Sequence, residues 1–207
     1  MIPKQSSRHL SFIVVFAFAL IVLMGVQPSL AAEFEAQIVV YQEGATVNGY
    51  VFVSGDKVRV DMTGPRGKII TIARPDKGLT WIVNVPKKEY VEIQGVVINP
   101  LGMRPAQEWE KVAKVKSLGQ DKFGGFVCER ILYTFFDESK GAVMEWKALD
   151  LNFTIKSILY SPKELVTTEL SEIKVEPVDD VAFEMPEGYK KVMVKKSTGQ
   201  GVKDGKQ

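Results

Sequence analysis

The sequence predicts a single domain built mainly of β-strands, preceded by an export signal. Turn-forming residues recur about every ten positions, which is the rhythm of a meandering antiparallel sheet. Between Lys57 and Met62 polar and apolar residues alternate, which is the period of a half-buried strand. The length of 207 residues suits one domain with its own core.

The N-terminus has the three parts of a secretory signal. Lys4, Arg8 and His9 form a positive start, an apolar run extends from Phe12 to Val26, and Ser29-Leu30-Ala31 offers small residues for cleavage. The alternative is an uncleaved membrane anchor, but a spanning helix wants roughly 20 apolar residues. We therefore expect residues 1–31 to be removed and the protein to be exported to the periplasm as a soluble species. Ala32-Glu33 follows the cleavage site and offers no cysteine for lipidation.

The strands expected in order are bounded by glycine, proline and aspartate turns, which tolerate the backbone angles that tight turns need. They cover residues 33–42, 47–53, 58–62, 68–73, 79–85, 89–93, 114–118, 126–136, 142–148, 152–160 and 165–175.

One short helix is expected among these strands. Residues 105–115 place Trp109, Val112 and Ala113 at helical spacing, with Pro105 in the first turn. Asp179-Asp180 is a candidate cap for a last helical turn. Residues 195–207, rich in Gly, Lys, Gln and Ser, are expected to be a disordered tail, which leaves residues 32–194 as the folded domain.

The strands over 126–136 and 152–160 are apolar on both faces. In the first of them Cys128 and Leu132 oppose Tyr133 and Phe135. Both sides of this part of the sheet should therefore be covered. One side could pack on a helix, and the other could line a cavity.

Composition excludes several classes of function. The full chain has 27 basic and 25 acidic residues, and removal of the signal takes away Lys4 and Arg8. The mature chain then has equal numbers of basic and acidic residues, and the lack of a basic excess disfavours nucleic acid as a partner. His9 is the only histidine, so the mature chain lacks histidine catalysis and histidine metal ligation. Cys128 is the only cysteine, and we expect a small buried apolar residue in preference to a reactive thiol. No cofactor and no transition metal are expected.

Several segments in succession resemble the periplasmic carriers of outer-membrane lipoproteins, the LolA/LolB-like superfamily, and an uncharacterised branch of it in particular. The resemblance covers roughly residues 34–191, and its strength lies in the order of the pieces. The matching pieces are Gly55-Asp56-Lys57-Val58-Arg59-Val60-Asp61, Arg74-Pro75-Asp76-Lys77 with Trp81, Lys87-Lys88-Glu89-Tyr90, Leu118-Gly119 with Gly125, Glu145-Trp146, and Phe183-Glu184-Met185-Pro186-Glu187-Gly188-Tyr189.

The resemblance implies a mainly β (α+β) fold, in which a strongly curved antiparallel sheet forms an unclosed half-barrel with short plugging helices. Its concave face would hold acyl chains or other apolar groups. No motif identifies the arginine that locks the lid in the carriers, and Arg104 and Arg130 are both candidates.

The candidate residues of an apolar cavity are large and apolar, and methionine and aromatic side chains suit loosely defined acyl chains. Taken singly, each is also compatible with ordinary core. A curved sheet with little helix to cover it favours a pocket for the group. The six candidates are Trp81, Tyr133, Phe135, Met144, Trp146 and Phe153.

Other charged groups could have a function or could be ordinary surface residues. Lys87-Lys88 and Lys190-Lys191 could contact anionic lipid headgroups or could be solvated turn residues. Asp179-Asp180 and Glu169 with Glu172 could pair as glycosidase carboxylates do, but acidic residues are frequent enough to pair by chance. We expect no enzyme.

Three functions stay open at this point. The first is a binding or carrier protein for lipid or for the acyl chains of a lipoprotein, the second a periplasmic regulator that uses the same fold for protein contacts, and the third a structural envelope component. We expect a monomer whose partners are lipid or acylated protein, and an envelope membrane or transport complex is a further candidate partner.

The secreted form should begin at Ala32 or Glu33. N-terminal sequencing of the periplasmic fraction measures this directly. Full-length protein retained in the membrane would contradict the prediction of a released carrier.

Overall fold

The computed structural model of the chain describes residues 32–101 and 106–193, and these form one twelve-stranded sheet. The strand order is β12-β6-β5-β4-β3-β2-β1-β11-β10-β9-β8-β7. The strands are β1 (Glu33–Gln42), β2 (Ala45–Ser54), β3 (Lys57–Gly64), β4 (Gly67–Arg74), β5 (Leu79–Asn84), β6 (Glu89–Gln94), β7 (Ala113–Phe123), β8 (Phe126–Phe135), β9 (Ala142–Ala148), β10 (Phe153–Tyr160), β11 (Leu165–Lys174) and β12 (Lys190–Lys191).

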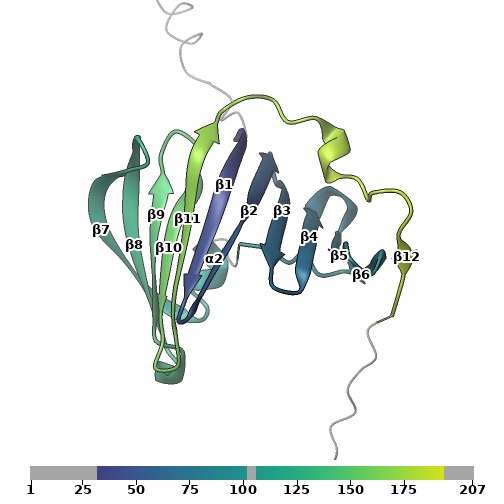
Figure 1. The fold of residues 1–207 in the computed structure, drawn as a ribbon. Helices are drawn as coiled ribbons and strands as arrows, with labels where there is room; N and C mark the ends of the chain where they lie inside the picture. Colours follow the sequence, from purple (N-terminus) through teal and green to yellow (C-terminus); the bar gives the residue numbers. More distant parts are fainter. Residues whose placement is uncertain (1–31, 102–105, 194–207) are drawn as a thin grey trace, which may run out of the picture. The chain divides into compact units, whose positions relative to one another are not determined.

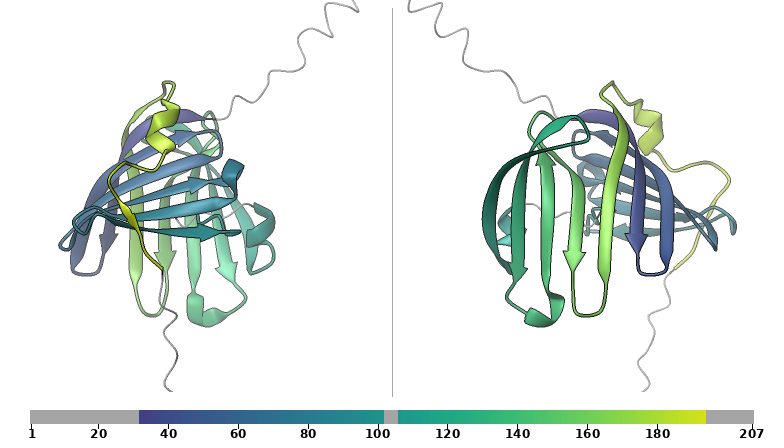
Figure 2. Two further views of the ribbon diagram at one scale, coloured as in Figure 1. Left: turned by 90° about the vertical axis from the view of Figure 1, so that its right-hand side faces the viewer. Right: turned by 60° about the vertical axis from the view of Figure 1, so that its left-hand side comes forward.

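Two meanders make up this sheet, and β1 joins them. Strands β1 to β6 follow one another as antiparallel neighbours, as do β7 to β11, and β1 pairs with both β2 and β11. The sheet curves strongly, and its edge strands do not meet (Figures 1 and 2). The prediction of an unclosed antiparallel half-barrel is thereby confirmed.

Helix is scarce in the described part of the chain. It comprises α2 (Ala106–Trp109) and the 3-10 turns η1 (Pro75–Lys77), η2 (Glu138–Lys140) and η3 (Asp180–Phe183). The helix expected over 105–115 was too long, because Ala113 already pairs with Phe135 and starts the edge strand β7. Ladder hydrogen bonds to β8 outweigh the helix propensity of Ala113 and Lys114, because tertiary context commonly overrides propensity. The expected cap at the last helical turn is confirmed, since the Asp179 side chain accepts a hydrogen bond from the backbone N–H of Val181 at 2.9 Å.

The β7–β8 hairpin is longer than its sequence suggested. A bulge between Ser117 and Gln120 lets β7 continue past Gly119, whose φ is +84°. The chain then turns at Gly124 and Gly125, which both have positive φ, and such pairs favour the tight hairpin turns that match strand twist.

The members of the largest core cluster that come from β1 to β4 lie on one face of the sheet. Val58 and Val60 are buried there and Met62 packs against them, as the alternation from Lys57 to Met62 predicted. The fully or nearly fully buried members are Phe34, Ala36, Ile38, Val51, Val53, Val58, Val60, Ala73, Cys128, Ala148, Leu151, Ile155 and Leu170.

A second cluster lies on the other face of β4 and β5. Ala73 belongs to the first cluster, so its neighbour Ile72 points to the opposite face, where it packs with Trp81 and Phe183. Phe183 comes from the C-terminal strap, which we define as residues 175–193 and which crosses this face of the sheet in Figure 2 (left). The strap supplies the second layer that an apolar sheet face requires.

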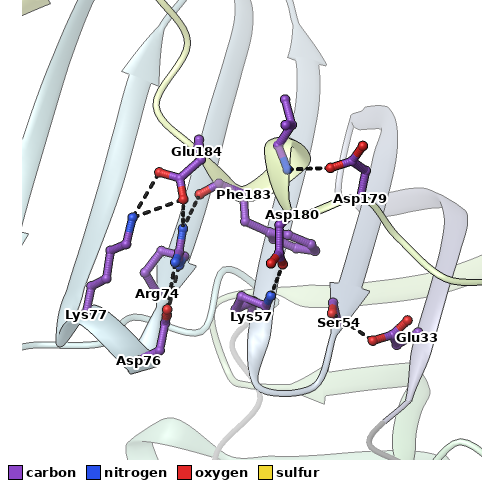
Figure 3. A network of polar contacts seen from close by, with 11 residues as sticks. Glu33, Ser54, Lys57, Arg74, Asp76, Lys77, Asp179, Asp180, Phe183 and Glu184 are labelled. Carbon is purple, nitrogen blue, oxygen red and sulfur yellow. Dashed lines mark hydrogen bonds and ion pairs between the residues drawn. The ribbon is translucent and has the colours of Figure 1, made fainter.

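Ion pairs hold the strap where Phe183 enters the cluster (Figure 3). Arg74 is nearly buried and donates to the carbonyl oxygen of Phe183 at 3.1 Å and to Glu184 Oε1 at 2.6 Å. Asp76 binds the same guanidinium through both carboxylate oxygens. Lys57 pairs with Asp180 on the strap. The pieces Arg74-Pro75-Asp76-Lys77 and Phe183-Glu184 thus form one structural unit.

The strap also protects one edge of the sheet. β12 pairs with β6 in parallel, and Lys191 forms a salt bridge with Glu92 at 2.8 Å. Glu92 in turn accepts a hydrogen bond from Trp81 Nε1 at 3.1 Å. At the other edge β7 exposes Lys114, Lys116 and Lys122, and exposed lysines discourage edge-to-edge pairing.

Acid should release the strap. Hydrogen bonds from Arg74 lower the pKa of Asp76 to about 2, and Arg74 and then Lys77 lower the pKa of Glu184. A lowered carboxylate pKa adds stability above the ordinary pKa, and this stability is lost as pH falls from about 4.5 towards 2. Limited proteolysis between pH 5 and pH 2 should therefore show strap cleavage rising on acidification.

A neutral variant gives the same test without acid. Glu184→Gln at pH 7 should accelerate strap cleavage up to about five-fold, because a half-exposed ion pair is worth about 1 kcal/mol or less. Glu187→Gln is the matched control, since Glu187 is exposed on the same segment. Equal cleavage of both variants would contradict the role given to Glu184.

Candidate ligand pocket

Three connecting segments lie at one end of the sheet, because every second turn of an antiparallel meander falls at the same end. They are the turns β1–β2, β8–β9 and β10–β11, of which the last two form the lower end of the molecule in Figure 1. Gln42 of the first donates to Glu164 Oε2 of the third at 2.7 Å. Gly141 has a φ of +75°, and a Cβ at this position would overlap the carbonyl oxygen of Tyr160. The turns β8–β9 and β10–β11 are therefore in direct contact.

A pocket of about 460 Å³ opens at this end. Its apolar side is formed by Val112, Phe135 and Leu159, and its polar side by Ser139, Lys140, Ser161, Lys163 and Glu164. The backbone N–H of Phe136 donates to the carbonyl oxygen of Val112 at 3.0 Å, which fixes the segment after α2 against the end of β8. The pocket thus lies between α2 and the turns β8–β9 and β10–β11.

An aromatic cluster adjoins the apolar side of the pocket. Trp109 of α2 stacks on Tyr133 with ring centroids 4.4 Å apart and an interplanar angle of 22°. Its ring also lies 5.7 Å from that of Phe135. Trp109 and Tyr133 are 3% and 5% exposed, so the helix closes this part of the sheet as a plug. The expectation of a short plugging helix is confirmed by this contact.

A carboxyl group is buried beside the aromatic cluster. Glu145 is 5% exposed and accepts a hydrogen bond from Thr154 Oγ1 at 3.2 Å. Burial raises the pKa of Glu145, and burial followed by the nearby Glu145 charge raises the pKa of Tyr133. The neighbouring Thr154 and Tyr133 hydroxyls offset part of this rise in the pKa of Glu145. Glu145 thus has a hydrogen-bonding partner, Thr154, as buried polar groups require.

The six candidates of the sequence analysis fall into separate places. Tyr133 and Phe135 belong to the aromatic cluster, and Phe135 alone of the six lines the pocket. Trp146 and Phe153 pack on the largest core cluster, where the Phe153 ring meets Phe34 edge-on at 5.1 Å.

The other two candidates lie elsewhere. Met144 is the register partner of Leu132 and Ile158, and strand alternation points it away from the side chain of its neighbour Val143, which belongs to the aromatic cluster. Trp81 lies beneath the strap. Among the described residues these six side chains thus do not gather in one place, and a ligand role for each remains a prediction.

Sequence reasoning missed most of the pocket. Val112 was assigned to a helix, Leu159 to a two-faced strand, and the two lysines lie in turns. A signal was present in the register of the strands, since Phe135, Val143 and Leu159 occupy the same face of adjoining strands. Reading it would have required the strand pairing in advance.

The remaining groups singled out from the sequence have ordinary surroundings. Cys128 is buried, as expected, and burial raises the pKa of its thiol, which disfavours the reactive thiolate. Arg130 Nε lies 3.8 Å from Asp121 Oδ2, whereas Arg104 lies outside the described residues. Over 32–101 and 106–193 no group of three acidic or cysteine side chains could hold a metal ion.

Helices of these same two stretches are all too short to cross a membrane.

Comparison with known proteins places the chain by fold. No protein-family model and no curated protein sequence matches it. A solved structure of an uncharacterised conserved protein from Thermus thermophilus is 11% identical with a TM-score of 0.59, over 84% of this chain and 98% of that one.

Two structures of MucB are also similar. MucB alone is 14% identical with a TM-score of 0.54, over 84% of this chain and 65% of that one. The Pseudomonas aeruginosa MucA/MucB complex matches at 13% identity with a TM-score of 0.54, over 80% of this chain and 60% of the matched one. The chain therefore spans less than two thirds of the MucB chains. At such identities these likenesses establish a shared fold, that of the unclosed curved sheet.

Proposed function

We propose that the protein binds and carries an apolar ligand, a lipid or the acyl chain of a lipoprotein, in the periplasm. The observation that carries the proposal is the pocket whose apolar side, Val112, Phe135 and Leu159, adjoins the aromatic cluster under α2. Its volume of about 460 Å³ lies within the range of roughly 300–1,000 Å³ usual for small-molecule sites. The export signal expected from the sequence supports the cellular setting.

The plug formed by α2 supports uptake of a larger ligand. This helix has four residues, and short isolated helices are marginal in water, so its position depends on Trp109 packing against Tyr133 and Phe135. An acyl chain that displaced Trp109 would replace one apolar contact by another. The aromatic cluster is therefore the proposed path by which the pocket lengthens when ligand enters.

A periplasmic regulator that acts through protein contacts is the second candidate. It is favoured by large side chains that stand exposed on the sheet surface, among them Tyr41, Tyr50 and Leu165 at 45%, 56% and 52% exposure. Tyr41 and Leu165 also flank a shallow depression near the β1–β2 turn. MucB, which shares the fold, has a known structure in complex with MucA.

Native mass spectrometry of the protein purified from its own envelope separates the two candidates. Co-purifying lipid or acylated protein supports the carrier. A stoichiometric protein partner with no lipid supports the regulator.

Binding of a long-chain amphiphile should stabilise the protein. Ligand at about 100 times its dissociation constant adds roughly 2.7 kcal/mol to the free energy of unfolding. For a domain of this size the melting temperature should rise on the order of 5–10 °C. A thermal melt with and without lysolipid measures the shift, and no shift with any amphiphile would remove the main support for a carrier.

Phe135→Glu should abolish this shift. The charge would stand at the half-buried pocket wall, where water is within reach, so the fold should survive with a modest loss of stability while apolar ligand is rejected. Phe136→Glu is the matched control, because Phe136 is the next residue and is 65% exposed. If Phe135→Glu unfolds while Phe136→Glu behaves as wild type, Phe135 is closed core and the pocket assignment fails.

A further inference from the structure

We infer that the pocket selects an amphiphile with an anionic head group, which Lys140 and Lys163 bind at the pocket mouth. The inference rests on the proposed function and adds the class of ligand to it. Two lysines from different turns line the polar side of a pocket whose other side is apolar. This arrangement is complementary to a molecule with one apolar chain and one negative end.

The ammonium groups of the two lysines are available to bind an anion. The Lys163 side chain is exposed and forms no hydrogen bond or ion pair within the described ranges. In the same ranges the Lys140 ammonium is paired only with Asp137, at 3.6 Å, and both side chains are more than half exposed. An exposed pair of this kind contributes about 0–1 kcal/mol, so a ligand anion competes with it easily.

The acidic groups near the mouth are already engaged. Glu164 accepts the hydrogen bond from Gln42 at 2.7 Å. Asp137 accepts from the backbone N–H of Ser139 at 3.1 Å and from its hydroxyl at 2.6 Å, and these bonds lower the pKa of Asp137. The two serine hydroxyls are engaged as well, because Ser139 donates to Asp137 and Ser161 donates to the carbonyl oxygen of Glu164. The free hydrogen-bonding capacity of the mouth is therefore mainly that of the lysine ammonium groups.

The backbone holds both lysines at the same opening. Lys140 ends η2, which Asp137 caps, and the next residue, Gly141, touches the carbonyl oxygen of Tyr160. On the other turn the hydroxyl of Ser161 accepts from the backbone N–H groups of Lys163 and Glu164 at 3.3 and 3.1 Å. The turns are fixed while the four-carbon lysine side chains remain free to reach a carboxylate or a phosphate.

Four probes with the same ten-carbon chain test the inference: decanoate, decyl phosphate, decanol and decylamine. Calorimetric titration should give at least about ten-fold tighter binding of decanoate or decyl phosphate than of decanol, with decylamine weakest. The anion that binds tighter distinguishes a carboxylate from a phosphate source. The preference should shrink at high ionic strength, because exposed charges are screened.

Lys140→Gln/Lys163→Gln should lose this preference while still binding decanol. Lys116→Gln/Lys122→Gln is the matched control, because it removes the same charge from exposed positions on β7 and should keep the preference. The two double variants should melt as wild type does, since all four lysines are exposed.

Three outcomes would count against the inference, and they can be told apart. Equal binding of decanol and the anions by wild type overturns head-group selection but leaves the apolar carrier standing. A preference that persists in Lys140→Gln/Lys163→Gln places the anion elsewhere. Failure of all four probes to bind wild type removes the proposed function itself.

Discussion

A single open sheet has two faces, and the burial of both is the constraint on which this structure depends. Strands β4 and β5 show it most clearly, because Ala73 points into the largest core cluster while its neighbour Ile72 packs under Phe183 of the strap. At the other end Cys128 and Tyr133 divide in the same way between two clusters. Curvature and α2 cover one face, and the strap covers the other face of β4 and β5. Where that cover is incomplete, beside Phe135 and Leu159, a pocket remains.

Charge determines where the strap lies, and apolar contact determines how firmly it is held. Arg74 is 7% exposed and would be costly to bury alone, yet it is satisfied by Asp76, Glu184 and a main-chain carbonyl. Arg59 repeats the arrangement one strand away, with Asp61 as its partner and the carbonyl oxygen of Ala182 as its strap contact. Two sheet arginines thus bind the backbone of the strap next to Phe183. Such bonds favour one register of the strap over others, since a shift by one residue would leave both arginines without their carbonyls.

Local pattern was sufficient for much of the fold. The alternation at Val58 and Val60 and the turn residues between strands predicted the meander, because these depend on neighbours in the chain. The reach of the helix after Pro105 and the path of the hairpin past Gly119 were not predictable in this way, because they depend on pairing between β7 and β8. The pocket escaped prediction for the same reason. Phe135 could be suspected from its side chain, but Lys140 and Lys163 become neighbours only when two turns are brought together by strand order.

The contact between Gly141 and Tyr160 has a consequence for how such a protein can change over generations. Position 141 tolerates no side chain, so any substitution there would force the turns β8–β9 and β10–β11 apart. Positions 140 and 163 carry no such restriction, since their side chains leave the backbone towards water. Descendants of this chain could exchange those two residues for neutral or acidic ones without rebuilding the scaffold. Ligand preference could then change through residues 140 and 163, whereas the packing of the two turns would require glycine to be kept at position 141.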